Sequence, residues 1–327
     1  MIKVSVLVAV YNSERYLSQC LNSLINQTLK DIQVICVDDC STDSSLKILY
    51  DYAEKDNRID VIHLNENKGP AHARNQGLLR VKGKYVCFLD SDDWFAPDAL
   101  ELAVNTFEKY PLTGCVLFDC HHVDSVGEKT PFQNSHFIVK SGTEAFIDSL
   151  TWKIHGVYMV TSEIHFRFPY DETCKTYSDD NTTRLHYFNS KEVRECSGIY
   201  YYRQNNNSIT HIVNTNHLDY LRANESMMKT LLQLNCDKDV LHQYHQLRWL
   251  NLVGVYYFYF RHRPKLSKSQ RQEYTEVIHE FWKKIIPDKD KQTDKFGYRH
   301  CKSWQRFKLQ EELYFFLRCI LDFFRKN

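Results

Sequence analysis

The sequence predicts an α/β fold with a mostly parallel sheet that is flanked by helices. Two patterns in the first 120 residues lead to this prediction. Short continuous runs of β-branched and other apolar residues are typical of strands buried on both faces. Between these runs, apolar residues recur at helical spacing. Since strand–helix–strand units place their strands side by side, the alternation indicates a sheet covered by helices on both faces.

The predicted elements follow one another in a regular order. The strands are Val4–Val10, Ile32–Val37, Ile59–Leu64, Tyr85–Leu89 and Cys115–Phe118. The helices between them carry the apolar stripes of Leu17–Ile25 and Leu46–Ala53, then span Pro70–Leu79 and Pro97–Phe107. Ser41 or Asp43 is the expected cap of the second helix, and Pro97 suits the first turn of the fourth.

The rest of the chain divides into two further regions. Residues 120–210 show mixed short strands and loops, which end in the polar and aromatic run Tyr200–Ser208. Beyond His211 the spacing is helical, with apolar stripes within 218–232, 249–260 and 313–324. We therefore expect one part at 1–210 and a helical part at 211–327.

The composition narrows the class of protein. The formal net charge of +1 over 327 residues does not indicate a nucleic-acid partner. The chain has eleven cysteines but no C-x-x-C pair, and most of them lie in apolar runs, which is typical of a reducing compartment. The first apolar run ends at Tyr11 and is too short for a signal peptide or a membrane span. We expect a cytoplasmic protein.

Acidic residues follow two of the predicted strands. Asp38-Asp39 comes after the second strand and Asp90-Ser91-Asp92-Asp93 after the fourth. Because parallel strands bring their carboxyl ends to one edge, where such folds bind ligands, both clusters are expected at the same site. Asp90 and Asp92 form a D-x-D pair that could hold Mg²⁺ or Mn²⁺ and leave positions open for phosphate oxygens. The alternative is a solvated acidic turn ahead of a helix.

Four motifs together resemble the family 2 glycosyltransferases, which have the GT-A fold. They are VSVLVAVYNSERYL, VDDCSTD, NKGPAHARNQG and FLDSDD, and they cover residues 3–110 in unbroken order. The resemblance implies a catalytic domain at 1–210, with nucleotide-sugar binding at 1–110 and the acceptor side at 111–210, and a helical region at 211–327. It also implies transfer of a sugar from a UDP-sugar to an acceptor hydroxyl, in lipopolysaccharide or capsule-type glycan synthesis.

The same resemblance implies roles for individual residues. Tyr11 would stack on the nucleobase, Asp39 would hydrogen-bond it, Arg74 would contact the donor, and Asp92 would coordinate the metal that bridges the diphosphate. The full substrate-binding set is Val10, Tyr11, Glu14, Asp38, Asp39, Arg74, Asp90 and Ser91, and the metal set is Asp92, Asp90 and His211, with Mn²⁺ or Mg²⁺ as cofactor. Two residues depart from the family pattern: Cys40 replaces a usual Gly, and Ala9 replaces a frequent Pro or Thr.

A catalytic base is expected some way beyond the D-x-D pair. The nearest match is Ser178-Asp179-Asp180-Asn181, in which we favour Asp180, with Asp179 as second choice. The base must remove the proton from an acceptor hydroxyl on a glycan or a lipid-linked glycan. Since one candidate base and no clear covalent nucleophile are found, the resemblance and the residues predict inversion. The alternative is a helix N-terminus that carries favourable acids, with Ser178 as its cap.

The C-terminal stripe Leu313–Phe324 has two interpretations. With Lys308, Arg318, Arg325 and Lys326 beside it, the stripe could lie peripherally on the anionic inner face of the cell membrane. It could instead pack onto the catalytic domain or a second subunit, which would form a homodimer.

Other classes of protein fit less well. A dinucleotide-dependent oxidoreductase would need a G-x-G-x-x-G motif after the first strand, where Tyr11–Arg15 stands instead. A haloacid-type phosphatase has its D-x-D after the first strand, not the fourth. A glycoside hydrolase would need two carboxylates across a cleft and would have no use for a nucleotide site. A nucleotide-sugar-binding scaffold without turnover stays open as the non-enzymatic alternative.

Overall fold

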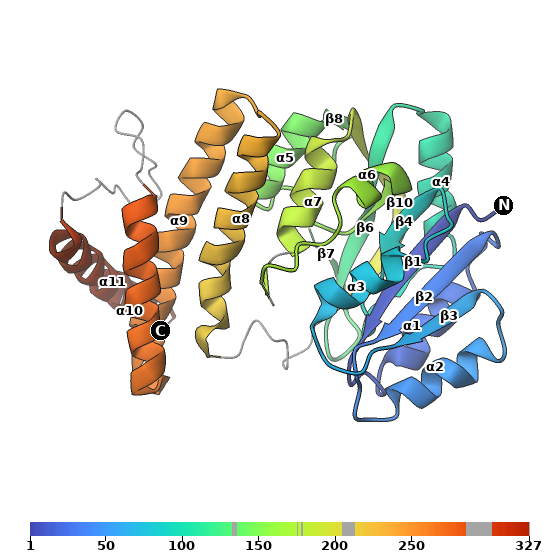
Figure 1. Ribbon diagram of the computed structural model, residues 1–327, viewed down its shortest axis with the longest axis horizontal. Coiled ribbons are helices and arrows are strands. Elements are labelled where there is room, and N and C mark those ends of the chain that lie inside the picture. Colours follow the sequence, from blue (N-terminus) through green and yellow to red (C-terminus); the bar gives the residue numbers. More distant parts are fainter. Residues whose placement is uncertain (133–135, 175, 178, 205–212, 286–302, 327) are drawn as a thin grey trace. The chain divides into compact units, whose positions relative to one another are not determined.

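The computed structural model describes residues 1–132, 136–174, 176–177, 179–204, 213–285 and 303–326. The chain forms two compact units, Met1–Asn207 and Ser208–Asn327. In Figure 1 the first unit runs from blue to yellow-green and the second from yellow-orange to red. The expected boundary between residues 210 and 211 lies outside the described residues.

The first unit is built on one mixed, mostly parallel sheet (Figure 1). Its main strands run in the order β3-β2-β1-β4-β9-β6-β10-β5, with β7 beside β6 and β8 beside β10. The pairs β1–β2, β2–β3, β1–β4 and β6–β10 are parallel, whereas β9 lies antiparallel between β4 and β6. The strands are β1 (Val4–Val10), β2 (Ile32–Asp38), β3 (Ile59–His63), β4 (Tyr85–Phe88), β5 (Trp94–Phe95), β6 (Thr113–Val123), β7 (Lys129–Pro131), β8 (Val139–Ser141), β9 (Tyr158–Thr161) and β10 (Glu192–Arg203).

Helices cover both faces of this sheet, as predicted. One core cluster joins the strands to Leu21, Leu49 and Leu100 of α1, α2 and α4. The other joins them to Ala73 of α3 and Tyr187 of α7. The helices are α1 (Leu17–Ile25), α2 (Ser45–Ala53), α3 (Pro70–Leu78), α4 (Ala99–Lys109), α5 (Gly142–Leu150), α6 (Ser162–Arg167) and α7 (Asp179–Phe188).

Several local predictions differ from the structure. Pro97 precedes α4 instead of starting it, because Asp98 is the N-cap and the two-residue strand β5 ends just before Ala96 and Pro97. The predicted strand at 115–118 is the middle of the longer β6. The described residues within 120–210 form the helices α5, α6 and α7 as well as strands, and the tyrosines at 200–202 lie near the end of β10.

The second unit is helical, as predicted. It contains the 3₁₀ turns η2 (Thr215–Leu218) and η3 (Arg263–Lys265) and the helices α8 (Asp219–Gln233), α9 (Lys238–His262), α10 (Lys268–Lys284) and α11 (Trp304–Lys326). Its core gathers large aromatic side chains, among them Trp249, Tyr256, Tyr274, Phe307 and Phe315. None of the described helices is both long and apolar enough to cross a membrane.

Substitution by alanine at two glycines is expected to change the stability of the fold in opposite directions. A Cβ at Gly198 in β10 would lie 2.6 Å from the backbone oxygen of Ala99, so Gly198→Ala forces strand and helix apart. We expect a loss on the order of 2 kcal/mol in the free energy of unfolding. Gly254 is exposed within α9 and has open space around it, so Gly254→Ala should add roughly 0.5–1 kcal/mol. Urea unfolding of both variants measures this, and a neutral Gly198→Ala would contradict the close approach.

Candidate functional site

The loops that follow β1 and β2 are held together by hydrogen bonds. The backbone N–H of Asn12 donates to Ser41 Oγ at 3.0 Å, and Asn12 Oδ1 accepts from the backbone N–H of Thr42 at 2.8 Å. Asn12 has a φ of +49°, a left-handed conformation that asparagine tolerates better than most residues. Glu14 Oε2 accepts from the backbone N–H of Ser44 at 2.9 Å. Glu14 is thereby engaged with the second loop.

The loop after β4 joins the same group. Ser91 Oγ lies 2.7 Å from Ser13 Oγ, within hydrogen-bonding distance. The turn from Asp90 to Asp93 is closed by the backbone N–H of Asp93, which donates to the carbonyl of Asp90 at 3.0 Å. The structure thus brings the segments after β1, β2 and β4 together at the carboxyl edge of the sheet.

Asp38 and Asp39 are both buried and hydrogen-bonded inside the protein. Asp38 Oδ2 accepts from the backbone N–H of Ser41 at 3.1 Å and lies 2.9 Å from His63 Nδ1. The two carboxylate oxygens of Asp39 accept from the backbone N–H groups of Lys68 and Gly69, at 3.0 and 2.7 Å. Asp39 therefore fixes the turn that leads into α3, and each oxygen keeps a second lone pair for a ligand.

Cys40 adopts a φ of +64°, which accounts for the glycine usual at this position. A residue with a Cβ pays roughly 1–2 kcal/mol for the left-handed conformation, which glycine adopts freely. Cys40 also places its thiol 3.6 Å from the carbonyl oxygen of Asn65. The turn is therefore retained, at a cost in backbone strain.

Arg74 and Asp90 form an ion pair between α3 and the end of β4, in which Arg74 is buried and Asp90 is partly exposed. Nη2 of Arg74 donates to Asp90 Oδ1. The guanidinium carbon lies 4.5 Å from the ring centre of Phe88 and 5.3 Å from that of Tyr170. Burial disfavours the charged form of Arg74, but the Asp90 carboxylate and the more distant Asp179 outweigh it and raise its pKa. Arg74 is therefore held as a fixed cation.

Asp93 anchors the acidic turn to β10. Its Oδ2 accepts from the Tyr200 hydroxyl at 2.7 Å, and its Oδ1 accepts from the backbone N–H of Arg203 at 2.7 Å. Burial raises the pKa of Asp93 well above its ordinary range, and the nearby carboxylates of Asp90 and Asp92 raise it further. The three carboxylates are thus close enough to repel one another.

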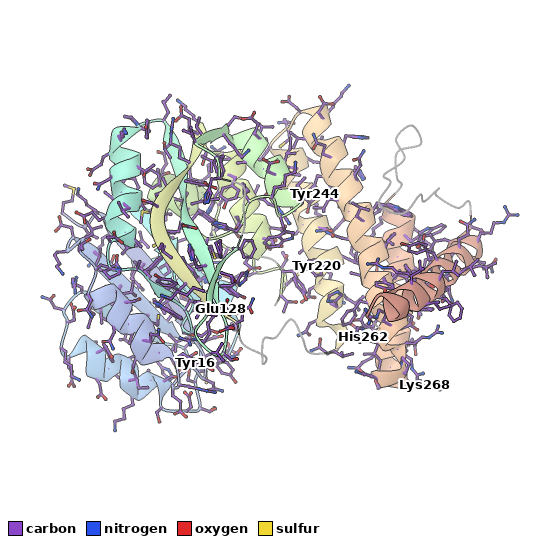
Figure 2. All side chains as sticks on the ribbon, turned by 180° about the vertical axis from the view of Figure 1, so that it is seen from behind. Tyr16, Glu128, Tyr220, Tyr244, His262 and Lys268 are labelled. Carbon is purple, nitrogen blue, oxygen red and sulfur yellow. The ribbon has the colours of Figure 1, made fainter. Side chains whose placement is uncertain are left out.

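The side chain of Arg203 closes the same turn from its other side. Its Nε donates to the backbone oxygen of Asp92 at 2.8 Å, and its Nη2 donates to Gln19 Oε1 at 2.6 Å. The guanidinium lies 4.7 Å from the ring centres of both Tyr16, labelled in Figure 2, and Trp94. Arg203 thereby ties the acidic turn to α1 and to β10.

The two candidate bases lie in the first turn of α7. Asp179 is exposed, whereas Asp180 is half-buried with Oδ2 at 3.5 Å from Nη2 of Arg184. The pKa of Asp180 is raised to about 6, because burial and the charge of Asp179 raise it by more than the charge of Arg184 lowers it. The expected cap, Ser178, lies outside the described residues.

A short segment connects α7 to the Arg74 pair. Asn75, next to Arg74, exchanges two hydrogen bonds of 2.9 Å with the backbone of Tyr170. The backbone N–H of Asp171 donates to Thr182 Oγ1 at 3.1 Å, and the Asp171 carboxylate accepts from the Asn181 amide at 2.8 Å. This chain of contacts places the start of α7 relative to the buried arginine.

The remaining predicted residues are distributed as follows. Val10 is buried, and its carbonyl accepts from the backbone N–H of Asp39 at 2.8 Å, whereas Tyr11 is exposed. His211 lies outside the described residues. Within the part of the chain that the structure describes, no group of three or more His, Cys, Asp or Glu side chains is arranged to hold a metal ion. The metal set therefore stays a prediction.

Sequence reasoning gave no role to Asp93, Tyr200 or Tyr170. Asp93 stands directly after the D-x-D pair, and a third acid there is the one signal that could have indicated a structural carboxylate. Tyr200 is the buried tyrosine in a run of three, and alternation along an extended strand would have singled it out. Tyr170 lies in an irregular segment whose sequence carries no pattern.

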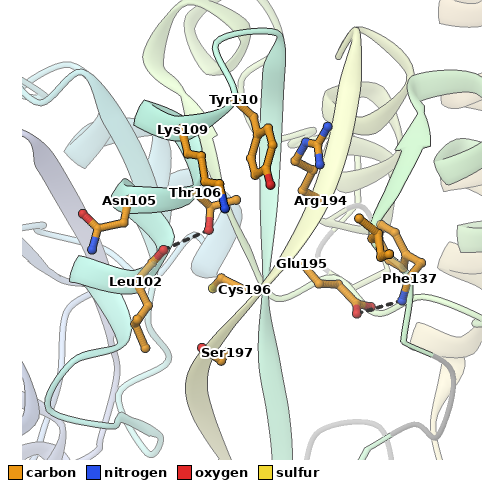
Figure 3. Close-up of a pocket in the computed structure, with 11 residues that line it drawn as sticks. Leu102, Asn105, Thr106, Lys109, Tyr110, Phe137, Arg194, Glu195, Cys196 and Ser197 are labelled. Atoms are coloured by element: carbon orange, nitrogen blue, oxygen red, sulfur yellow. Dashed lines mark hydrogen bonds between the residues drawn. The ribbon is translucent and has the colours of Figure 1, made fainter.

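A separate cavity of about 390 Å³ lies beside β10, between α4 and the segment at 137–138 (Figure 3). It is lined by residues such as Lys109, Tyr110 and Arg194, and the Glu195 carboxylate there accepts from the backbone N–H of Phe137 at 3.0 Å. Arg194 stacks on Tyr110, with its guanidinium carbon 3.7 Å from the ring centre. The cavity contains none of the predicted site residues.

Comparison with known proteins gives concordant results. The model of Glycosyl transferase family 2 matches residues 5–170. The putative glycosyltransferase EpsH of Bacillus subtilis is 48% identical over 103 residues, which are 32% of this chain and 30% of EpsH. The uncharacterized glycosyltransferase EpsJ of the same organism is 30% identical over 220 residues, 64% of this chain and 63% of EpsJ. The match thus spans less than two thirds of either relative.

Solved structures share the architecture. Residues 1–349 of S. aureus TarS, in complex with UDP-GlcNAc, superpose with a TM-score of 0.67 over 87% of this chain and 82% of TarS, at 22% identity. The crystal structure of the same fragment in complex with UDP gives a TM-score of 0.66. This likeness confirms the predicted GT-A type fold with a helical C-terminal region.

The Asp93 contacts predict a contrast between two substitutions. Asp93→Ala leaves the buried Tyr200 hydroxyl and the partly buried Arg203 backbone N–H without their acceptor, and the loss at Tyr200 alone should cost about 1–3 kcal/mol. Asp93→Asn is nearly isosteric and retains an acceptor for Arg203, so it should lower the free energy of unfolding by clearly less. Urea unfolding followed by circular dichroism compares the two variants. Equal losses would show that Asp93 fills space without holding the turn.

Proposed function

The chain belongs to glycosyl transferase family 2, and we propose that it is an inverting, metal-dependent enzyme that moves a sugar from a UDP-sugar to an acceptor hydroxyl. One observation carries the proposal above all. The loops after β1, β2 and β4 are hydrogen-bonded together beside the Arg74–Asp90 pair, and the candidate bases of α7 are tied to the same pair through Tyr170. The segments that carry the proposed donor-binding residues and the proposed base are thus connected to the same ion pair, which supports a common site.

The donor is assigned to the edge where these loops meet. Tyr11 is exposed there and offers its ring to the base, while Asp39 and Glu14 offer carboxylate lone pairs to base or ribose groups. Arg74 is a fixed cation next to Asp90, suited to the negative charge of a diphosphate. TarS was crystallised with UDP-GlcNAc, which supports a UDP-sugar donor for a chain of the same fold.

The acidic turn suits a hard divalent cation. Asp90 and Asp92 both act to raise the pKa of the neighbouring Asp93, and the pKa of Tyr202 is raised to about 12 by burial and by these same carboxylates. The turn is thus a concentrated negative charge made of oxygen ligands, which Mg²⁺ and Mn²⁺ prefer. We assign Asp92, with Asp90, as the residues that would hold the metal. When bound, it supplies neutralisation of the charge on the leaving diphosphate.

Asp180 is assigned as the base. Burial and the negative charge of Asp179 raise its pKa to about 6, so the carboxylate is ionised at neutral pH yet basic enough to accept the proton of an acceptor hydroxyl. Arg74 stabilises the charge that builds up on the departing diphosphate. With one base and no assigned covalent nucleophile, the reaction is a single displacement with inversion.

The acceptor is assigned to the class of glycans and lipid-linked glycans of the cell surface, as in lipopolysaccharide or capsule synthesis. Two relatives support this class by their printed names. A poly(ribitol-phosphate) beta-glucosyltransferase of Bacillus spizizenii is 48% identical over 101 residues, and the putative teichuronic acid biosynthesis glycosyltransferase TuaG of Bacillus subtilis is 46% identical over 98 residues. Each match covers 30% of this chain, so the names of these relatives support only the general class of the acceptor.

The Asp180 assignment predicts a pH profile. Only the ionised base is active, so kcat/KM should fall as pH drops through about 6. Asp180→Asn should lower kcat roughly 10²–10⁴-fold. Asp179→Asn removes a negative charge that raises the pKa of Asp180, so it should keep activity and move the acidic limb to lower pH. If Asp179→Asn abolished turnover while Asp180→Asn did not, the roles would be reversed.

The anomeric configuration of the product tests the proposed inversion. We expect the new glycosidic bond to have the anomeric configuration opposite to that of the donor, as determined by NMR of the purified product. Retention would exclude a single displacement by an activated acceptor. Binding of UDP without transfer to any acceptor would instead favour the non-catalytic scaffold.

The metal assignment predicts a selective loss of affinity. Asp92→Asn should weaken the binding of UDP in Mn²⁺ by roughly tenfold or more, while binding in EDTA changes little, because one carboxylate ligand is removed. Asp98→Asn is the matched control, since Asp98 is exposed and makes no side-chain capping bond to α4. Isothermal titration of UDP with each variant gives the comparison. Identical UDP affinity with and without Mn²⁺ in the unaltered protein would exclude metal-dependent binding.

A further inference from the structure

Tyr202 is an exposed tyrosine beside the acidic turn, and it has no role in the proposed mechanism. It is the last residue but one of β10. Alternation along the strand puts Tyr200 and Tyr202 on one face of the sheet and Tyr201 on the other. Tyr200 is fully buried, whereas Tyr202 is 39% exposed. The ring of Tyr202 lies edge-on to His122, its partner on β6, with the ring centres 5.3 Å apart.

Two hydrogen bonds hold this end of β10 against the acidic turn. The carboxylate of Asp93 accepts from the Tyr200 hydroxyl and from the backbone N–H of Arg203, each at 2.7 Å. Tyr202 stands between these two donors in the chain, so its backbone is fixed next to Asp93 from both sides. Because β5 begins at Trp94 and pairs with β10 at the preceding tyrosine, residue 202 lies beside the turn itself.

The hydroxyl of Tyr202 is available to a ligand. Among the residues that the structure describes, none forms a hydrogen bond with it, whereas the hydroxyl of Tyr200 is bonded to Asp93. Burial raises the pKa of Tyr202 to about 12, and the carboxylates of Asp90, Asp93 and Asp92 raise it as well. The phenol therefore lies within the field of the acidic turn and stays protonated near neutral pH. It can both donate and accept a hydrogen bond.

The order of the strands indicates which part of the donor this hydroxyl meets. Under the proposed function, the base lies at the loops after β1 and β2, and the diphosphate lies at the turn after β4. β10 is on the other side of β4, beyond β9 and β6. Tyr202 is therefore at the end of the acidic turn that is remote from the nucleoside loops. A nucleotide sugar extends from its base through the diphosphate to the sugar, so the sugar is the part that comes nearest to β10.

We propose that Tyr202 is a further substrate-binding residue, whose hydroxyl forms a hydrogen bond with a hydroxyl group of the transferred sugar and not with the nucleotide. The inference rests on the proposed function, from which it takes the position of the donor. A sugar hydroxyl donates and accepts in the same way as a phenol, so each group satisfies the other. Such a contact discriminates against sugars that lack the hydroxyl, because the phenol then loses its partner.

The test compares the affinities for UDP and for a UDP-sugar by isothermal titration in Mn²⁺. The UDP-sugar is whichever of UDP-glucose, UDP-galactose and UDP-N-acetylglucosamine the unaltered chain binds most tightly. Tyr202→Phe should weaken the binding of the UDP-sugar roughly 3- to 10-fold, because one neutral hydrogen bond is lost, and should leave the binding of UDP unchanged. The Tm should also stay unchanged, since the hydroxyl has no partner among the described residues.

Tyr201→Phe is the matched control. It removes the same atom from the adjacent residue, whose ring lies on the other face of the sheet and stacks on Trp94 with the ring centres 5.2 Å apart. Neither affinity should change in this variant.

Four results would overturn the proposal. Equal weakening of UDP and UDP-sugar binding by Tyr202→Phe would assign the hydroxyl to the diphosphate. No change in either affinity would show that the hydroxyl does not contact the donor. A fall in Tm of several degrees would show that it stabilises the fold instead. Failure of the unaltered chain to bind UDP or any of the three UDP-sugars would contradict the proposed function itself, and the inference with it.

Discussion

The Arg74–Asp90 ion pair is the interaction on which the arrangement of the site depends. A guanidinium as buried as that of Arg74 needs a counter-charge, because an uncompensated buried ion costs several kcal/mol. Asp90 can supply it only if the turn after β4 stays against α3, and the rings of Phe88 and Tyr170 must remain beside the guanidinium. One cation therefore fixes the turn after β4 and, through Tyr170, the segment that leads to α7.

The parts of the fold that the sequence predicts are those in which burial alone determines the pattern. β1 and β2 are covered on both faces, so their runs are mostly apolar and could be identified; the buried Ser5 and Gln33 hydrogen-bond to each other. β10 could not be identified. Its pairing with β6 is interrupted between Glu195 and Ile199, its other edge is paired only in places, and its sequence mixes charged, small and aromatic residues. The antiparallel β9 has just four residues and follows an irregular segment, so no period reveals it.

The prediction of site residues from the sequence has a related limit. Motif residues that bind ligands and motif residues that hold loops have the same chemistry, since a carboxylate accepts hydrogen bonds from a backbone as readily as from a nucleobase. Sequence placed Asp38 and Asp39 together as substrate-binding, yet Asp38 faces Ser41 and His63 inside the protein, and Asp39 holds the turn at Gly69. Cys40 and Asn12 keep left-handed backbones without glycine. The shape of these loops is therefore specified by several weak contacts that no single motif position reveals.

The acidic turn separates two properties that are often treated as one, namely its geometry and its charge. Three hydrogen bonds hold the geometry of the turn. Asp93 accepts from a tyrosine hydroxyl and from a backbone N–H, and the side chain of Arg203 donates to a backbone carbonyl. None of these contacts is made to the carboxylates of Asp90 and Asp92. Arg74 meets the Asp90 carboxylate with a full positive charge. The turn is consequently rigid before any ligand binds but still rich in negative charge. Under the proposed function, such a turn would favour a divalent cation without requiring it for its shape, so binding energy would go to the diphosphate instead of to ordering the loop.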